Sequence, residues 1–515
     1  MGPEQTIALS YSPMNTQDIG FGQGFSIGLT LYDANNRLLI LSTGERYKVD
    51  ETKDMVFLKQ YKQGVVRFEK DVTQNIYRVI HKSGLVEILT GPKNAFDLKV
   101  PVQLFDPMGH YLKLSWNYDS NSFPQLASIS DAEKVLLSVL YEPDIYTSIT
   151  VWPEASESYD IKLFFENNRV TEIQNNTPNQ TLSWTFDYDE DSKFLIQVSS
   201  PTGLIEYVSY ISDGHQFPED SGLAPLPYVT QYTQNSGHDP NIVRSYQYTD
   251  YNFLGHGGEG DWGNDDDYLY GVLSDYQYGS TEICNDGTTQ RSVTRYYNNY
   301  HLQVSETIEQ GECKRVHQTK YYAVVGSVFE QQPPQFQMPK MATVCFNDSS
   351  DKETTHTQFD EAGNPTVQIA PDGTRTEWTY YPAEGEPDFC PADPHGFVRY
   401  VKSKTVTPGK PSTQGTYEDA PVHTVLYRYA QLPAPIGAPS PYAVVQIYQG
   451  LYSSDKRPIF NGTPPFATVE RPCQNSHDIG QLLHESLLHY IHDVNSPDHG
   501  RVHRIDETIY TYQDQ

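Results

Sequence analysis

The densest set of residues that could do chemistry is an acidic, glycine-rich stretch. It reads Gly255-His-Gly-Gly-Glu-Gly-Asp-Trp-Gly-Asn-Asp-Asp-Asp267. Ca²⁺ prefers flexible loops that offer several carboxylate oxygens. The spacing misses the EF-hand pattern, however, and Gly-Gly-Glu-Gly-Asp occurs once and is one residue short of the calcium β-roll repeat. We expect a solvated surface loop over 255–267, with Ca²⁺ binding as the alternative.

A second set of candidate ligands lies close to the C-terminus. The motif His484-Glu485-Ser-Leu-Leu-His489 is one residue longer than the zinc-protease motif. On a helix its two imidazoles would point about 140° apart, so both cannot face one metal ion. The protease interpretation is therefore rejected. The open alternatives are a solvated helix face and a looser metal cluster built from His477, His484 and His492 with Asp478 or Asp493.

The remaining candidates are weaker. Glycines at 20, 22, 24 and 28 do not give Gly-x-Gly-x-x-Gly and are not followed by a strand–helix unit, which argues against phosphate binding. The acids Asp187, Asp189, Glu190 and Asp191 are adjacent, as in a turn, and no Gly-x-Ser-x-Gly elbow is present. We assign no catalytic, cofactor-binding or metal-binding residue, and we predict that the chain is not an enzyme.

Composition narrows the class of protein further. The formal net charge of −30 would repel phosphate backbones and anionic membranes, so we expect no nucleic-acid partner. No apolar stretch is long enough to span a membrane. Thirty-nine tyrosines favour β structure, because a tyrosine ring packs on a pleated surface while its hydroxyl stays hydrated.

The five cysteines form no Cys-x-x-Cys pair, which excludes a zinc ribbon or a redox pair by spacing. Free thiols are expected, and a Cys284–Cys313 bridge is the alternative. The first residues carry no basic region or apolar run, so no signal peptide is predicted. Strand-like residues 6–11 and 507–512 stand at the two ends, and we expect the chain to belong to a longer protein.

The elements that must position these residues are hairpins. Four turns recur between strand-like segments, at His81–Leu85, Asp106–His110, Ser200–Leu204 and Ala370–Thr374. Counted from the glycine of the turn, positions +5 and +7 carry Leu114 and Trp116, Val208 and Tyr210, and Trp378 and Tyr380. Residues two apart share one face of a strand, so each unit should bury the same side.

Helix signals are few. The leucines in 482–488, behind a Ser476 or Asp478 cap, predict one short helix over 476–492, and residues 130–136 are a shorter candidate. The proline-rich region 382–441 predicts surface loops rather than central strands. A connector-like segment over 218–240 divides the chain into an N-terminal β region, 1–225, and a repeat region, 226–515.

Residues 359–381, Phe-Asp-Glu-Ala-Gly-Asn-Pro-Thr-Val-Gln-Ile-Ala-Pro-Asp-Gly-Thr-Arg-Thr-Glu-Trp-Thr-Tyr-Tyr, form the clearest hairpin unit, with an Asp-Gly turn between two strands. Their order resembles the YD repeat of the RHS family, with Phe359 at the usual tyrosine. The stretch Gly20-Phe-Gly-Gln-Gly-Phe-Ser26 is similar to the family's Gly-x-Gly-x-Gly-Trp-Ser segment, with Phe25 at the tryptophan.

This resemblance implies an all-β antiparallel array that curls into part of a hollow shell. RHS proteins, found in bacterial polymorphic toxins and Tc insecticidal complexes, enclose a C-terminal toxin in such a shell. A self-cleaving aspartyl protease segment closes the shell in that family, but no matching motif is visible here, so no catalytic residue is carried over.

The resemblance also bears on partners and localisation. The expected function is a scaffold whose partners are the enclosed toxin, further repeats of the same polypeptide and proteins of a secretion or toxin complex. The protein would reside in the bacterial cytoplasm before export and then be secreted. The alternative is a β module that binds carbohydrate or a cell-surface partner through exposed aromatic side chains. A hydrolase that uses the acidic loop is a third class, for which no site geometry can be drawn.

Overall fold

The computed structural model describes residues 5–15, 18–52, 55–93, 97–120, 122–263, 266–409, 420–454 and 481–509. Almost all regular structure in these residues is β-strand. The exceptions among them are three 3-10 turns, η1 (Glu219–Ser221), η2 (Tyr268–Gly271) and η3 (Phe329–Gln331). The predicted all-β antiparallel hairpin array is confirmed.

One antiparallel sheet, here called the wall, runs from β7 to β34, and each strand pairs with the next one in the chain. Its strands are β7 (Val66–Asp71), β8 (Ile76–His81), β9 (Val86–Thr90), β10 (Leu98–Phe105), β11 (Tyr111–Tyr118), β12 (Pro124–Ser130), β13 (Val135–Glu142), β14 (Tyr146–Val151), β15 (Tyr159–Glu166), β16 (Arg169–Asn176), β17 (Thr181–Tyr188), β18 (Leu195–Ser199), β19 (Ile205–His215), β20 (Leu226–Asn235), β21 (Ile242–Tyr248), β22 (Gln277–Asn285), β23 (Gln290–Asn298), β24 (Gln303–Gln310), β25 (Cys313–Tyr321), β26 (Pro339–Phe346), β27 (Lys352–Phe359), β28 (Pro365–Ile369), β29 (Arg375–Tyr380), β30 (Val401–Thr407), β31 (His423–Pro433), β32 (Tyr442–Ser453), β33 (Gln481–Tyr490) and β34 (Val502–Ile509).

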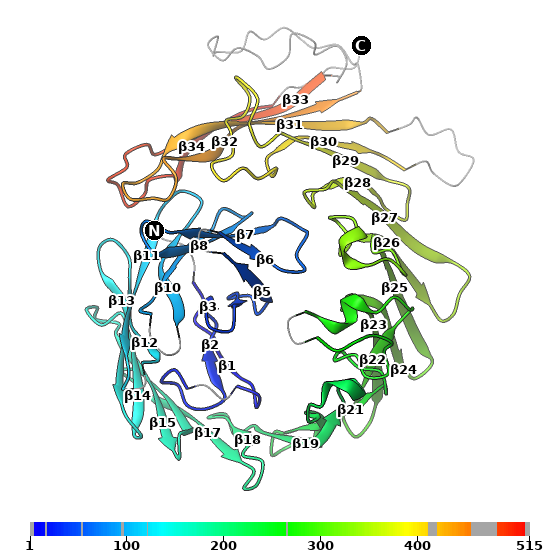
Figure 1. Cartoon of the computed structure of the whole chain (residues 1–515). Helices are drawn as coiled ribbons and strands as arrows, with labels where there is room; N and C mark the ends of the chain where they lie inside the picture. The colour runs from blue at the N-terminus through cyan, green and yellow to red at the C-terminus, as the bar shows by residue number, and fades with distance from the viewer. Residues whose placement is uncertain are drawn as a thin grey trace.

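Six shorter strands precede the wall and lie inside its curve (Figure 1). They are β1 (Leu9–Tyr11), β2 (Phe25–Ile27), β3 (Leu31–Asp33), β4 (Leu38–Ile40), β5 (Arg46–Glu51) and β6 (Val56–Leu58). β1 and β2 form a separate two-stranded sheet. β3 to β6 pair in order, and β3 also pairs with β10, which attaches these four strands to the wall.

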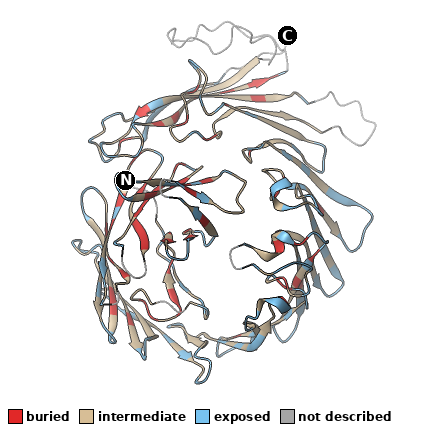
Figure 2. Cartoon of the chain, in the orientation of Figure 1, coloured by how far each residue is buried: buried red, intermediate tan, exposed pale blue. Residues whose placement is uncertain are grey.

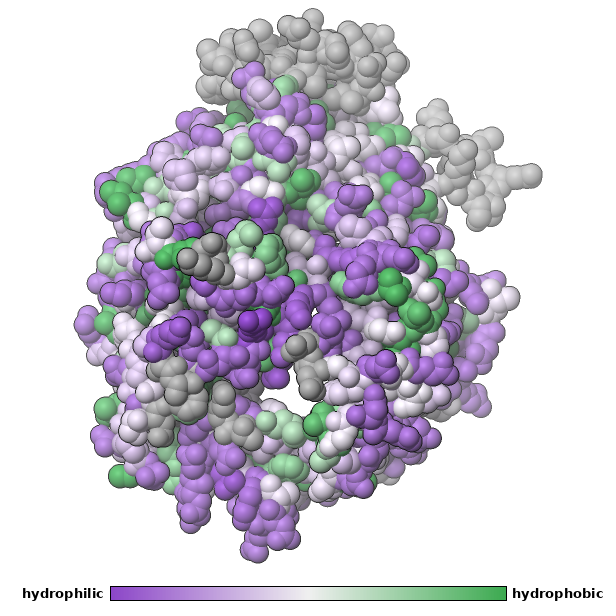
Figure 3. Space-filling model, viewed as in Figure 1, coloured by the Kyte–Doolittle hydropathy of each residue, from purple (hydrophilic) through white to green (hydrophobic). Residues whose placement is uncertain are grey.

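The wall bends through about one full turn, and its last strands come back beside its first ones (Figure 1). Among the described strands β7 pairs with β8 and β34 pairs with β33, and no pairing joins β7 to β34. The wall therefore encloses space without closing into a barrel. An opening inside the ring is visible in the space-filling view (Figure 3).

Hydrophobic burial is concentrated where the inner strands cover the wall (Figure 2). One cluster joins Phe21 and Phe25 of the N-terminal segment to Leu114, Leu126 and Val170 of the wall. A second cluster surrounds Tyr32 and Leu39, which are fully buried. Burial of such side chains contributes roughly 1.5–3 kcal/mol each, so this half has a conventional core.

The predicted turns are confirmed. Gly84, Gly109, Gly203 and Gly373 lie between β8 and β9, β10 and β11, β18 and β19, and β28 and β29. Gly363, before β28, has φ +76°, and Gly373 has φ +82°. An L-residue with a side chain rarely adopts these values, which explains the glycines.

The helix predicted over 476–492 is wrong where the structure describes it. Residues 481–490 form β33, paired with β32 and β34, and residues 476–480 lie outside the described residues. Leu482, Leu483, Leu487 and Leu488 are adjacent in pairs, so each pair puts one leucine on each face of a strand, and all are half-buried. Backbone hydrogen bonds to β32 and β34 favour the strand more than the leucine spacing favours a helix.

Two further expectations need correction. Residues 130–136 form the end of β12, a turn and the start of β13 rather than a helix. The proline-rich region 382–441 does hold a long loop, 381–400, but β30 and β31 also lie in it and pair on both sides, so they are central strands. The sheet runs without a break across residue 225, because β19 pairs with β20; the division into two regions stays a prediction.

Candidate functional site

The residues that set the shape of the wall are aromatic side chains next to β-bulges. Register shifts recur near the C-terminal ends of odd-numbered strands, for example between Ser209 and Tyr210, Gln358 and Phe359, and Tyr296 and Tyr297. A bulge bends its strand and increases the local twist. Repeated at the same end of successive hairpins, such bulges curve a sheet in one direction.

A partly buried hydrogen bond accompanies each of these bulges. An aromatic side chain near the C-terminal end of an odd strand donates to a backbone carbonyl of the preceding strand, at the residue that faces or flanks the bulge; we call these bonds aromatic latches. The latches are Trp116–Pro101, Tyr141–Leu126, Tyr188–Val170, Tyr210–Leu195, Tyr248–Val229, Tyr321–Gln303, Tyr380–Pro365 and Tyr490–Gln446, with donor–acceptor distances between 2.6 and 3.1 Å.

The latches explain the repeat seen in the sequence. Trp116, Tyr210 and Tyr380, the +7 residues after the turn glycines, are all latch donors. Their carbonyl acceptors sit where the bulge disturbs the ladder, and a buried carbonyl without a partner is costly. Burial raises the pKa of both Tyr210 and Tyr380 to about 12, so these hydroxyls keep the proton that they donate.

Two of the latch side chains face the inner N-terminal segment. Trp116 packs against the cluster that contains Phe21 and Phe25, and the Tyr141 ring lies 6.0 Å from the Phe21 ring. The N-terminal segment that carries both phenylalanines lies inside the wall (Figure 1).

The wall has two different rims because its strands alternate in direction. Loops that follow odd strands share one rim, the long-loop rim, which carries 216–225, 249–276, 322–338 and 381–400. Turns that follow even strands share the other, the short-turn rim, with tight turns such as 106–110 and 370–374. The long loops with η1, η2 and η3 lie on the inner side of the wall (Figure 1).

The two rims meet where the last strands return to the first; we call this contact the seam. Lys82, in the turn after β8, donates to Ala362 O at 2.7 Å and to Asn364 Oδ1 at 2.6 Å. Arg399, in the loop after β29, donates to Lys82 O at 2.8 Å. His110 bonds to His499 O at 2.6 Å. The short-turn rim of the first hairpins is thus held by the long-loop rim of the last ones.

A buried ion pair organises the seam loop 381–400. Arg399 Nε lies 2.6 Å from Asp393 Oδ2, and the exposed fractions of the two side chains are 13% and 0%. Asp393 Oδ1 also accepts backbone N–H groups of His395 and Phe397. Phe397 is buried with Ile80, Val86, Ile88 and Phe105 of the first hairpins. The loop therefore holds Phe397 in the apolar cluster of the first hairpins.

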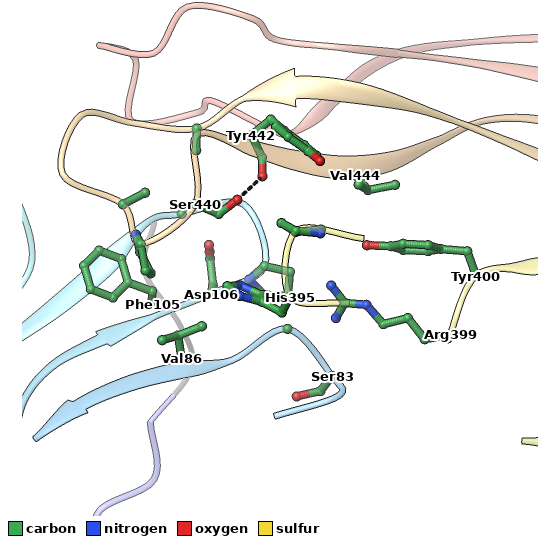
Figure 4. A pocket seen from close by; sticks show the side chains of 17 residues that line it. Ser83, Val86, Phe105, Asp106, His395, Arg399, Tyr400, Ser440, Tyr442 and Val444 are labelled. Atoms are coloured by element: carbon green, nitrogen blue, oxygen red, sulfur yellow. Dashed lines mark hydrogen bonds between the residues drawn. The ribbon is translucent and has the colours of Figure 1, made fainter. Parts of the chain in front are cut away.

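A cavity of about 220 Å³ lies in the seam (Figure 4). Val86, Phe105, Asp106, His395, Arg399 and Tyr400 are among its lining residues. Asp106 accepts the backbone N–H groups of Met108 and His110 at 2.9 Å, and burial raises its pKa. Burial lowers the pKa of His395. Polar groups that line this cavity hold the turns at 106–110 and 393–399 in place.

Aromatic side chains hold the acidic loop predicted as a candidate Ca²⁺ site. Tyr268 donates to Gly258 O at 2.9 Å, and Tyr276 donates to His256 O at 2.8 Å. Asp267 caps η2 and lies 2.8 Å from His301 Nε2. The other described carboxylates, Glu259, Asp261 and Asp266, are exposed. In the described residues no three His, Cys, Asp or Glu side chains are grouped so that they could hold a metal ion.

The other candidates are dispersed. His484 lies on β33, His489 pairs with Asp506 at 3.0 Å, and His477 and Asp478 lie outside the described residues. Asp189 accepts N–H groups of Asp191 and Ser192 in the turn after β17, as adjacent acids were expected to do.

The glycine-rich segment binds its own carboxylate. Asp18 Oδ1 accepts the backbone N–H groups of Gly20, Phe21 and Gly22 at 2.7–3.1 Å. These donors are the kind that would hold a phosphate, and they are already used. A Cβ atom added at Gly20 would clash with the Tyr141 ring, and one added at Gly22 would lie 3.0 Å from Val170, a tight contact.

The alternative Cys284–Cys313 bridge is wrong. Cys284 is on β22 and Cys313 on β25, with two strands between them. Strands are about 4.8 Å apart, so the two residues lie about 14 Å apart, beyond the reach of a disulfide. Both are free, as are Cys345 and Cys390; Cys473 lies outside the described residues. Over the described ranges, none of the helices has the length and hydropathy of a membrane span.

No protein-family model matches the sequence, and no curated protein matches it. Among solved structures, the chain is similar to one of the Photorhabdus luminescens Tc holotoxin pore with a TccC3 mutation, at 8% identity and a TM-score of 0.31, covering 91% of this chain and 25% of that one. It is also similar to TcdB2–TccC3 without the hypervariable C-terminal region, at 8% identity and a TM-score of 0.24, covering 93% and 27%. The chain spans about a quarter of these chains' length.

Proposed function

We propose that this chain is a wall segment of a β shell that encloses a polypeptide, and that it acts as a scaffold rather than an enzyme. The observation that carries the proposal is the seam. The wall turns once and holds its own start by rim contacts while β7 and β34 stay unpaired with each other in the described structure. Such a sheet encloses space and can still be extended.

What the shell encloses, and what completes it, is inferred from the sequence resemblance to YD repeats of the RHS family. The enclosed polypeptide would be a toxin domain, made in the bacterial cytoplasm and exported with its shell, and further repeats would complete the shell. The curvature of the wall also supports a shell. Latches and bulges recur from β11 to β33, and each bulge bends the sheet.

Protease protection tests the shell. The natural gene product that contains this chain is digested under native conditions, and we expect one segment besides the wall to resist. Arg399→Ala leaves the Asp393 carboxylate buried without its partner, so the seam opens and the protected segment is cut about tenfold faster or more.

Arg504→Ala is the matched control, because Arg504 is 58% exposed and pairs with Asp506 of the same strand. It should leave protection unchanged. The shell proposal fails if no segment besides the wall is protected, or if Arg399→Ala and wild type are digested at one rate.

A panel of peptide, ester and glycoside substrates tests the scaffold against the hydrolase class. We expect no turnover. Turnover that Asp261→Ala or His484→Ala abolishes would overturn the scaffold proposal and identify the reacting groups.

The second candidate is a carbohydrate-binding module, favoured by one exposed tryptophan beside a half-buried tyrosine. Trp152 is 45% exposed and lies edge-on to Tyr159, with ring centroids 6.3 Å apart. Exposed indole rings stack on sugars through their apolar faces. Binding to a glycan array that Trp152→Ala abolishes would favour this module over the shell.

A further inference from the structure

An aromatic pocket on the inner face of the wall has no role in the shell as described so far. The cavity, of about 220 Å³, lies at β21 and β22 and is lined by His215, Tyr248, Phe253, Tyr278 and Tyr297, with Tyr251 at its edge. Tyr278 packs on the inner loop that carries η2. Tyr248 is opposite Ser280, which lies on the same face of β22 as Tyr278, so both rings are on the inner face.

The rings form two groups around the cavity. In the first, the His215 imidazole lies 4.8 Å from the Tyr248 ring and 5.1 Å from the Phe253 ring, both edge-on. In the second, Tyr278 stacks on Tyr297 at 5.4 Å. Tyr251 and Phe253 remain 48% and 41% exposed, so the cavity opens to solvent.

A hydrogen-bond relay fixes one wall of this pocket. The Tyr278 hydroxyl lies 2.8 Å from His301 Nδ1, and His301 Nε2 lies 2.8 Å from Asp267 Oδ2. His301 therefore connects the Tyr278 hydroxyl to the Asp267 carboxylate through its two ring nitrogens. The relay holds the Tyr278 ring in place.

The charges around the pocket suit a cation. Lysine and arginine are absent from its described lining. The nearest arginine in register, Arg295 opposite Ser280, is neutralised by Glu306 at 2.9 Å. Burial lowers the pKa of His215, so this imidazole is neutral at pH 7 and does not repel a positive guest. The chain as a whole carries a net charge of −30.

We propose that this pocket binds an organic cation, and that its occupant is a lysine or arginine side chain of the polypeptide inside the ring. Aromatic faces attract ammonium and guanidinium groups through the ring quadrupole. The identity of the occupant rests on the proposed shell; the binding of a cation does not.

Ligand-observed NMR with a matched pair of probes tests the pocket. Choline and 3,3-dimethylbutan-1-ol differ in one atom, N⁺ against C, and have the same shape. We expect choline to bind about 2- to 30-fold more tightly. Phe253→Leu keeps the apolar volume and removes the ring, and should bring the two affinities together. Phe346→Leu, 50% exposed and outside the pocket, is the matched control and should change nothing.

Equal affinities for the two probes in the wild type, or no effect of Phe253→Leu, would overturn the cation site. A second arm compares an unfolded arginine-containing peptide with its citrulline analogue. Preference for arginine, lost in Phe253→Leu, supports the occupant. Choline binding without that preference overturns the occupant alone, and the protease experiment reports separately on the shell.

Discussion

The two halves of the wall have the same strand architecture but are stabilised differently. From β7 to β17 the inner face is covered by the N-terminal segment, and residues such as Leu89, Leu114 and Leu126 are almost fully buried. From β22 to β29 the N-terminal core segment does not cover the inner face. The loops 249–276 and 322–338 lie on this side instead, and the buried strand positions there are Gly279, Val293 and Thr343. The second half depends on ladders, latches and paired polar side chains instead.

This difference shows what a curved sheet needs in order to enclose space. A filled core stabilises the first half but leaves no room inside it. In the second half, threonine pairs such as Thr281–Thr294 and Thr343–Thr354 bridge neighbouring strands, and Arg295 pairs with Glu306. Each cross-strand pair contributes about 0.2–1 kcal/mol, so many are needed.

Truncation of a hydrophobic side chain should show the largest difference in stability between the two halves. Leu126→Ala, in the covered half, is expected to lower the free energy of unfolding by about 2–5 kcal/mol because a cavity remains. Ile308→Ala, on half-buried β24, should cost about half of that or less. Urea unfolding measures both, and equal costs would contradict a difference in packing.

A turn in the open half gives the next largest effect. Gly373→Val forces a β-branched residue to φ +82° and should cost about 1–3 kcal/mol. The strain is in the backbone, since the nearest atom to an added Cβ is 3.5 Å away. Gly373→Asn is the control, because asparagine tolerates this region, and thermal melts should place it close to wild type.

Removing one latch should cost less. Tyr380→Phe keeps the ring and leaves the Pro365 carbonyl without its donor, for about 1 kcal/mol of lost stability. Tyr296→Phe is the matched control, since Tyr296 is 38% exposed and is not a latch donor. If both variants melt alike, the latches do not stabilise the curvature.

Alkaline pH probes the same latches and should have no effect near neutrality. The pKa of Tyr380 is raised to about 12 by burial and by Asp360, against about 10 when unfolded. The folded state therefore favours the protonated hydroxyl, and this stabilisation is complete below pH ~10 and lost as the pH rises to ~12. Phenolate absorbance and urea midpoints check it, and a midpoint that rises above pH ~10 would contradict the assignment.

Local sequence determined the class of structure and the positions of its turns. Asp-Gly turns, tyrosines and period-two alternation depend on residues close in the chain, which is why the hairpin over 359–381 was predicted correctly. Trp378 was expected to share a buried face with Tyr380. Trp378 is half-buried, and a bulge between Thr379 and Tyr380 interrupts the alternation. Replacing Trp378 with alanine should therefore cost less stability than the loss of a fully buried ring.

Tertiary structure decided what depends on distant partners. The leucines of 482–488 fit a helix in isolation, and β32 and β34 made them a strand. The +7 aromatics were visible as a pattern, but their carbonyl acceptors lie 15 residues or more away. The seam joins Lys82 to Asn364, some 280 residues apart, and the pocket joins His215 to Tyr297. Curvature accumulates strand by strand, so only the whole sheet brings such residues together.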